Sequence, residues 1–107
     1  MGRIIKIARD FSLTPGSRYK DEGNFSAEEF REDILTPEYC EAVKNGYKLT
    51  IDFDGALGYG TSWLEASFGG LARKYGVQDV LNVLIFVSTE EPYLIEDVIN
   101  YIKNAKG

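Results

Sequence analysis

Histidine is absent from this sequence, and cysteine occurs only once, at Cys40. The absence of histidine excludes His-based catalytic triads, His-metal sites and the usual general base near neutral pH. A single cysteine forms neither an internal disulfide nor a thiolate metal cage. Because Cys40 lies beside Glu41 in an expected helix, we expect a buried structural residue rather than a nucleophile.

Long apolar runs are also missing. The longest, residues 83–87, has the length of a strand and is far too short to span a bilayer. The sequence shows no signal-peptide pattern. We therefore expect a cytoplasmic protein, with no cofactor and no metal site.

Basic side chains are in the minority. Lys and Arg number 12 against 17 Asp and Glu, which gives a net charge of −5. A negative field repels nucleic acid and anionic membrane surfaces. The cations are also scattered along the sequence, as at Arg3, Arg18, Lys44, Arg73 and Lys103. Neither nucleic acid nor a membrane is expected as a partner.

The chain has 44% hydrophobic and 13% aromatic residues, which is the composition of a globular protein. Its length predicts one domain covering residues 1–107. Hydrophobic periodicity and turn residues predict strands alternating with helices. This order favours an α/β fold, a mixed and mainly parallel sheet with helices packed on it. The expected strands are 3–11, 47–53 and 80–87, with room for a short one at 18–21; the expected helices are 26–36, 37–45, 62–75 and 91–104.

Two Ser-x-x-Glu capping boxes, at Ser26 and Ser62, mark the expected starts of the first and third helices. Thr36-Pro37 is expected to end the first helix and begin the second, and Asn45-Gly46 to end the second. Gly69-Gly70 lies inside the third helix, where glycine is unfavourable. Close packing of that helix on the sheet would explain the pair.

Residues 51–65, IDFDGALGYGTSWLE, allow several interpretations. Asp52 and Asp54 at the end of a strand are similar to the aspartyl nucleophile motif of haloacid dehalogenase phosphatases, which implies phosphoryl transfer with Mg²⁺. That chemistry also needs a charge-balancing Lys and a later acidic cluster, but no expected strand after Asp54 ends in paired aspartates. An Mg²⁺-dependent phosphate binder or phosphoryl-transfer enzyme using Asp52 and Asp54 stays as the alternative function.

Two glycine-loop interpretations fail on single residues. The spacing from Gly55 to Ser62 is that of a P-loop, but Thr61 stands where the phosphate-binding Lys belongs. Gly58-Tyr59-Gly60 could begin a dinucleotide loop, but Trp63 stands where close packing requires glycine.

The remaining interpretation is a strand-to-helix turn with a hydroxyl at its crest. Residues 48–74, KLTIDFDGALGYGTSWLEASFGGLARK, resemble the STAS-like domains, small bacterial proteins related to anti-sigma-factor antagonists. Ser62-Trp63 and residues 65–71, EASFGGL, together with residues 23–33, GNFSAEEFRED, are most similar to a STAS-like family of unknown function. The resemblance extends over residues 3–87.

The resemblance implies a non-enzymatic regulatory adaptor that binds a protein partner, a GHKL-type kinase or ATPase, and is switched by phosphorylation. Ser62 takes the place of the superfamily's regulatory serine and Thr61 that of its neighbour, while Gly60 and Trp63 depart from the superfamily pattern. The partner surface is expected to include Tyr59, Gly60, Trp63 and Asp54. Ser62 would also serve as an N-cap, which alone is sufficient to explain a serine there.

Overall fold

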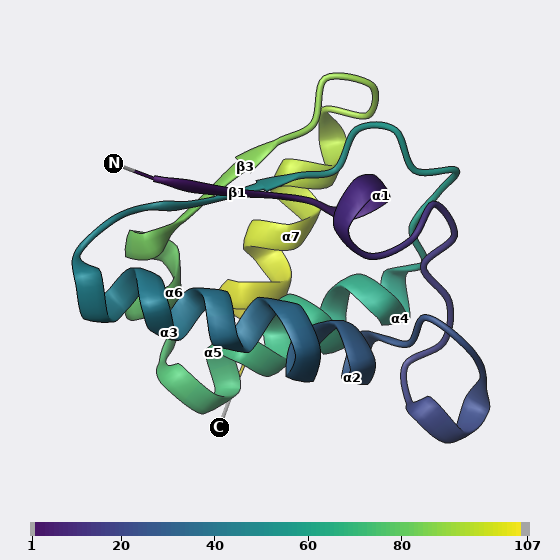
Figure 1. Cartoon of the computed structure of the whole chain (residues 1–107), viewed down its shortest axis with the longest axis horizontal. Helices are drawn as coiled ribbons and strands as arrows, with labels where there is room; N and C mark the ends of the chain where they lie inside the picture. The colour runs from purple at the N-terminus through teal and green to yellow at the C-terminus, as the bar shows by residue number, and fades with distance from the viewer. Residues whose placement is uncertain (1, 106–107) are drawn as a thin grey trace.

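The computed structural model describes residues 2–105, in which three short strands form one parallel sheet. The strands are β1 (Arg3–Lys6), β2 (Leu49–Asp52) and β3 (Leu84–Val87), with β2 in the centre. Long helices pack on one face of this sheet, and Figure 1 shows them beneath the strands. The predicted α/β fold is confirmed, and all three strands run parallel.

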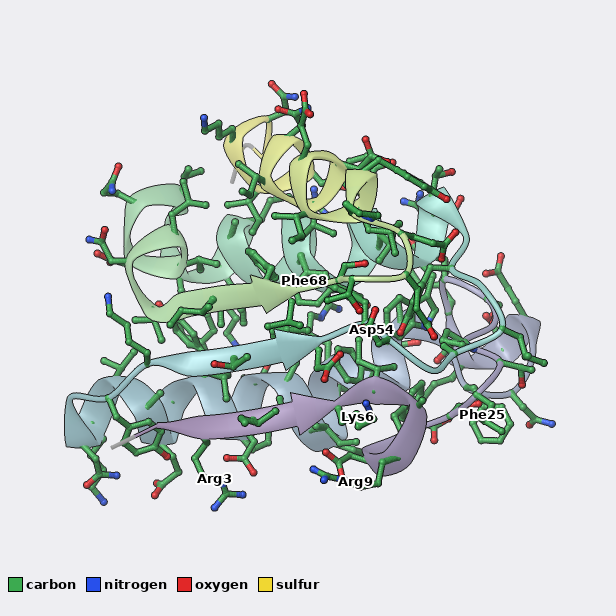
Figure 2. All side chains as sticks on the ribbon, turned by 90° about the horizontal axis from the view of Figure 1, so that it is seen from above. Arg3, Lys6, Arg9, Phe25, Asp54 and Phe68 are labelled. Atoms are coloured by element: carbon green, nitrogen blue, oxygen red, sulfur yellow. The ribbon has the colours of Figure 1, made fainter. Side chains whose placement is uncertain are left out.

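Side chains alternate between the two faces of the sheet, as the pleat of a strand requires. Ile5 and Ile51 point into the core and are 3% and 0% exposed. Ile4 and Ile85, which flank Thr50 in one row on the other face, are 60% and 46% exposed. Figure 2 looks onto this open face, with the helices behind it.

The first long helix runs without a break through three segments: α2 (Ala27–Phe30), the π turn η2 (Arg31–Leu35) and α3 (Thr36–Asn45). The prediction of two helices that meet at Thr36-Pro37 is wrong. A proline inside a helix crowds the carbonyl group four residues earlier. Here the N–H of Thr36 donates to the oxygen of Arg31, five residues back, so the turn is already wide when it reaches Pro37.

Both ends of this helix agree with the sequence. Ser26 is the N-cap, and its hydroxyl accepts the N–H of Glu29 at 3.0 Å. Gly46 ends the helix in the left-handed conformation, with φ of 72°. Glycine adopts that conformation without steric cost.

The second long helix has the same construction: α4 (Thr61–Leu64), the π turn η3 (Glu65–Gly69) and α5 (Gly70–Tyr75). It ends at Gly76, where φ is 102°, as predicted. The next helix, α6 (Val77–Val83), occupies the first half of the expected strand 80–87, so that part of the prediction is wrong. The last helix, α7 (Tyr93–Lys103), confirms its prediction.

The N-terminal segment differs in two places from the expected strands. The strand predicted over 3–11 ends at Lys6, and α1 (Ile7–Asp10) follows it. The carboxylate of Asp10 accepts the N–H of Lys6 at 2.9 Å and so holds the beginning of this turn. The short strand expected at 18–21 is instead a 3₁₀ turn, η1 (Lys20–Glu22).

The core lies between the sheet and the two long helices and is rich in aromatic rings. The ring centroids of Phe30 and Trp63 are 5.0 Å apart, and those of Phe53 and Phe68 are 5.7 Å apart. These rings lie beneath the carboxyl end of β2, so they support the loop that leaves that strand.

Candidate functional site: the turn between β2 and α4

The carboxyl ends of β1 and β2 place two charged side chains next to each other. Lys6 and Asp52 are paired in the strand register, and Lys6 Nζ lies 3.5 Å from Asp52 Oδ2. The other carboxylate oxygen of Asp52 accepts the N–H of Asp54 at 2.9 Å. Sequence reasoning missed Lys6, because only the register of the sheet brings it to Asp52.

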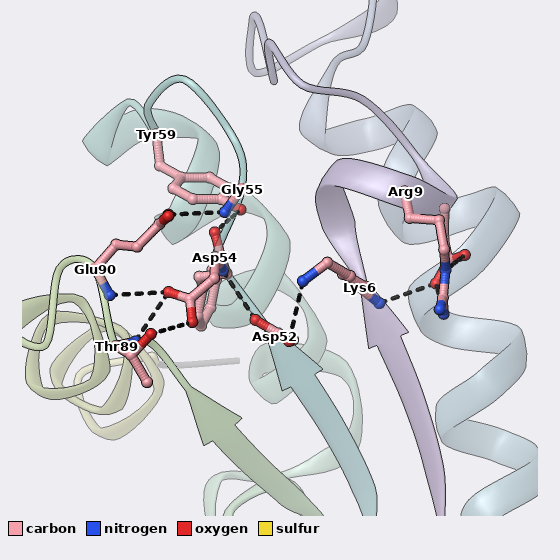
Figure 3. Close-up of polar contacts among 10 residues, drawn as sticks. Lys6, Arg9, Asp52, Asp54, Gly55, Tyr59, Thr89 and Glu90 are labelled. Atoms are coloured by element: carbon pink, nitrogen blue, oxygen red, sulfur yellow. Dashed lines mark hydrogen bonds and ion pairs between the residues drawn. The ribbon is translucent and has the colours of Figure 1, made fainter.

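Asp54 joins the loop after β2 to the loop after β3 (Figure 3). Its Oδ1 accepts the N–H groups of Thr89 at 2.9 Å and Glu90 at 3.0 Å, and its Oδ2 accepts the Thr89 hydroxyl at 2.5 Å. The N–H of Gly55 donates to Glu90 Oε1 at 2.8 Å, which gives a second link between the same two loops. These bonds hold the pKa of Asp54 below its usual value, with the Glu90 N–H as the largest cause.

This geometry weighs against a metal or nucleophile role for Asp54, because its carboxylate is engaged by the neighbouring loop. Across residues 2–105, no group of three or more Cys, Asp or Glu side chains is arranged to hold a metal ion.

Around Leu57, the turn between β2 and α4 presents aliphatic side chains to solvent. The N–H of Leu57 donates to the oxygen of Leu13 at 2.8 Å, so the loop after α1 lies against this turn. The side chains of Leu57 and Leu13 are 81% and 53% exposed. Sequence reasoning missed this pair, since the loop at Leu13 carried no signal of its own.

Tyr59 and Trp63 support the turn from inside. Trp63 is 0% exposed, and its indole N–H donates to the oxygen of Phe25 at 3.1 Å. The Tyr59 hydroxyl donates to the oxygen of Phe53 at 2.7 Å, and burial raises its pKa far above the usual value. Trp63 therefore has no side-chain surface to offer a partner, contrary to its expected place in the partner surface.

Ser62 occupies a different helical position from the expected one. The N-cap of α4 is Gly60, which has extended backbone angles and makes no side-chain cap bond. Thr61 and Ser62 are the first two residues of the helix, and both are exposed. The prediction that Ser62 is an N-cap is wrong, so capping does not explain a serine at this position.

Cys40 is exposed on α3, and its Sγ lies 3.5 Å from the Tyr75 hydroxyl. The prediction of a buried cysteine is therefore wrong. None of the helices within residues 2–105 combines the length and the apolar character needed to cross a membrane.

Comparison with known families agrees with this geometry. Residues 26–94 match the family model described as the STAS-like domain of unknown function (DUF4325). No curated protein and no solved structure matches the chain significantly. The matched region contains β2, the turn, both long helices and β3, and it covers more than half of the 107 residues. The chain therefore belongs to the STAS-like domain family of unknown function (DUF4325).

Proposed function

We propose that this domain is a non-enzymatic, regulatory protein-binding module whose partner docks on the turn of residues 57–62 together with Leu13. The observation that carries the proposal is the pair of exposed leucines: Leu57 is 81% exposed and hydrogen-bonded through its backbone to Leu13, which is 53% exposed. Adjacent apolar side chains on a surface suit contact with another protein. The rigid aromatic support beneath them keeps the turn in one shape, which lowers the entropy lost on binding.

Ser62 is the proposed control point, with Thr61 as its neighbour. Both hydroxyls are exposed in the first turn of a helix that continues to Tyr75. A partner kinase would transfer the γ-phosphoryl group of ATP to Ser62 Oγ, releasing ADP and the hydroxyl proton. A phosphate there is favoured by the helix dipole by about 0.3–1 kcal/mol, so the fold tolerates it while the docking surface gains negative charge.

The proposed partner is a GHKL-type kinase or ATPase, which the relation to anti-sigma-factor antagonists favours. The three hydrogen bonds that engage the Asp54 carboxylate support the binding role over the Mg²⁺-dependent alternative. Any Mg²⁺-dependent turnover of a phosphomonoester that vanished in Asp52→Asn would reverse this preference.

The test is affinity capture from the native host with the full chain as bait, reading out GHKL-type proteins by mass spectrometry. We expect Leu57→Ser to lose the partner because it removes the exposed apolar group, and Ser62→Asp to lose it because it adds charge. Ser62→Ala should retain it, with little change in stability because Ser62 caps nothing.

Val43→Ser is the matched control, since Val43 is a 54% exposed aliphatic residue on α3, away from the turn. It should capture the same proteins as the wild type. Retention of the GHKL-type protein by Leu57→Ser would show that the turn is not the docking surface.

A further inference from the structure

A cleft opens between the two long helices. It has a volume of about 600 Å³ and lies between η2 and the beginning of α3 on one side and α5 on the other. Arg31, Thr36 and Pro37 line it from the first long helix, and Gly70, Leu71 and Lys74 from the second. π turns occur frequently at functional sites, and Arg31 at the wall of this cleft belongs to one of them, η2.

Arg31 is fixed at the wall of this cleft. It is half-buried, and its Nη1 donates to the oxygen of Ala66 at 3.0 Å. Gly70 makes room for this arrangement, because a Cβ at residue 70 would overlap the guanidinium group. Gly70 therefore accommodates a side chain of the other helix, and the expected close packing on the sheet is not its reason. One guanidinium has five N–H donors, so the bond to Ala66 leaves donors for a ligand.

The cleft carries excess positive charge in a protein of net charge −5. Within residues 2–105, no carboxylate forms an ion pair with Arg31 or Lys74. Glu32 also lines the cleft, but its carboxylate is ion-paired with Lys20 at 2.6 Å. Lys74 Nζ lies above the ring of Tyr75, 5.5 Å from its centroid.

The neighbouring surface of the second long helix adds to this charge. Glu65 forms ion pairs with both Arg18, at 3.3 Å, and Arg73, at 2.5 Å, so two cations share one carboxylate. The fold thus gathers cations that are far apart in the sequence, and the prediction that they are scattered does not hold for Arg18 and Arg73.

We propose that this cleft binds a small organic phosphate. A guanidinium offers paired donors that match two phosphate oxygens, and Lys74 supplies the second positive charge for a dianion. The exposed apolar side chain of Pro37 contacts the organic part of the ligand. A volume of about 600 Å³ lies within the range of small-molecule sites and exceeds the need of an inorganic ion. This site is separate from the proposed partner surface at residues 57–62.

The experiment is an NMR titration of the full chain, labelled with ¹⁵N, using phenyl phosphate, inorganic phosphate and phenol as probes. We expect phenyl phosphate to shift the backbone amides of Gly70, Leu71 and Lys74. It should bind more tightly than inorganic phosphate, and phenol should leave these signals unmoved. Lys74→Gln should weaken phenyl phosphate binding roughly tenfold, as the loss of one charged hydrogen bond predicts.

Lys103→Gln, at an exposed lysine at the end of α7, is the control for charge alone and should bind like the wild type. Arg31→Lys keeps the charge but loses the paired donors, and it should also weaken binding. The proposal is overturned if phenyl phosphate leaves the amides of residues 70–74 unchanged, or if Lys103→Gln weakens binding as much as Lys74→Gln.

Discussion

The carboxylate of Asp54 ties together two loops whose residues are 35 positions apart in the chain. In the sequence, an aspartate two residues after Asp52 at a strand end is typical of a catalytic pair. In the structure, three hydrogen bonds from Thr89 and Glu90 engage Asp54. They hold the beginning of the turn that carries Leu57 against the loop after β3. The same bonds make the contribution of Asp54 to stability dependent on pH.

Asp54→Asn should flatten the pH dependence of stability. The pKa of Asp54 is lowered from its ordinary value of 3.8 by the Glu90 N–H and the Thr89 hydroxyl and N–H. A lowered folded-state pKa gives stability that is present above the unfolded-state pKa and is lost as pH falls through the folded-state pKa. Between about pH 5 and pH 3 the wild type should therefore lose more unfolding free energy than Asp54→Asn. Urea unfolding across this range measures the difference.

Asp21→Asn is the matched control, because it removes an exposed carboxylate from the 3₁₀ turn. Its unfolding free energy should follow the wild-type profile. Parallel profiles for Asp54→Asn and wild type would mean that the Asp54 bonds add no charge-dependent stability.

Ser26 and Ser62 share the Ser-x-x-Glu pattern, but only Ser26 caps a helix. Ser62 fails to do so because Gly60 already has extended backbone angles and a carbonyl that accepts the N–H of Leu64 at 3.1 Å. The helix thus begins two residues earlier than the pattern predicts. A local pattern cannot locate this start, because the buried Trp63 helps to determine it through a bond to the distant Phe25 carbonyl.

At the scale of elements, a contact between the two long helices explains Gly70 of the glycine pair. In each wide turn the N–H group bonds a carbonyl five residues back instead of four. Arg31, from one π turn, bonds the carbonyl of Ala66 in the other and crosses Gly70 to reach it. The two helices are therefore joined by a polar contact at their irregular turns, in addition to their apolar packing.

Gly70→Ala should destabilise the protein, and Gly69→Ala should not. Alanine at 70 displaces the Arg31 guanidinium and removes its hydrogen bond to the Ala66 carbonyl, a bond from a charged donor worth about 1.5–3 kcal/mol. The gain of about 1 kcal/mol in helix propensity offsets only part of that cost. Alanine at 69 meets only the ends of the Glu65 and Arg73 side chains. Their ion pair lies at the surface and contributes at most about 1 kcal/mol, so the propensity gain offsets what is lost.

Urea unfolding of both variants measures these effects, and the background variant Arg31→Ala identifies their cause. With Arg31 removed, Gly70→Ala should become stabilising by about 1 kcal/mol, since the collision is gone. An equal loss of stability in both backgrounds would assign the effect to a contact other than Arg31.

The elements that sequence reasoning placed correctly are those with strong local signals. Gly46 and Gly76 end their helices, and the pattern Leu94, Val98, Ile102 marks the buried face of α7. Residues 80–83 were misassigned because a short run rich in Val and Leu fits both a strand and a buried helix turn. The N–H of Val80 bonds the oxygen of Gly76, which begins the helix there.

The contacts that define the candidate site lay beyond local patterns. Lys6 meets Asp52 only through the strand register, and Leu13 meets Leu57 only through a loop contact. Such pairs join segments more than 40 residues apart, and a single sequence does not specify them. The fold class was predictable because the order of strands and helices depends on signals within each segment.

At the scale of the whole molecule, the matched family region is smaller than the folding unit. Residues 26–94 contain β2, β3 and both long helices. The sheet also requires β1, which pairs with β2 along its length. Beyond Leu94, helix α7 continues with Val98 and Ile102, both fully buried.

A fragment of residues 26–94 should therefore fail to fold cooperatively. It lacks four side chains that are at most 3% exposed in the full chain, those of Ile5, Ile7, Val98 and Ile102. Each contributes about 1.5–3 kcal/mol by burial, and together they amount to much of the 5–15 kcal/mol that stabilises a typical domain. Far-ultraviolet circular dichroism and thermal melts of this fragment and of residues 2–105 provide the measurement. We expect a single sharp transition for residues 2–105 and a broad, featureless melt for residues 26–94. A cooperative melt of the shorter fragment would mean that β1 and the end of α7 are accessory to the core.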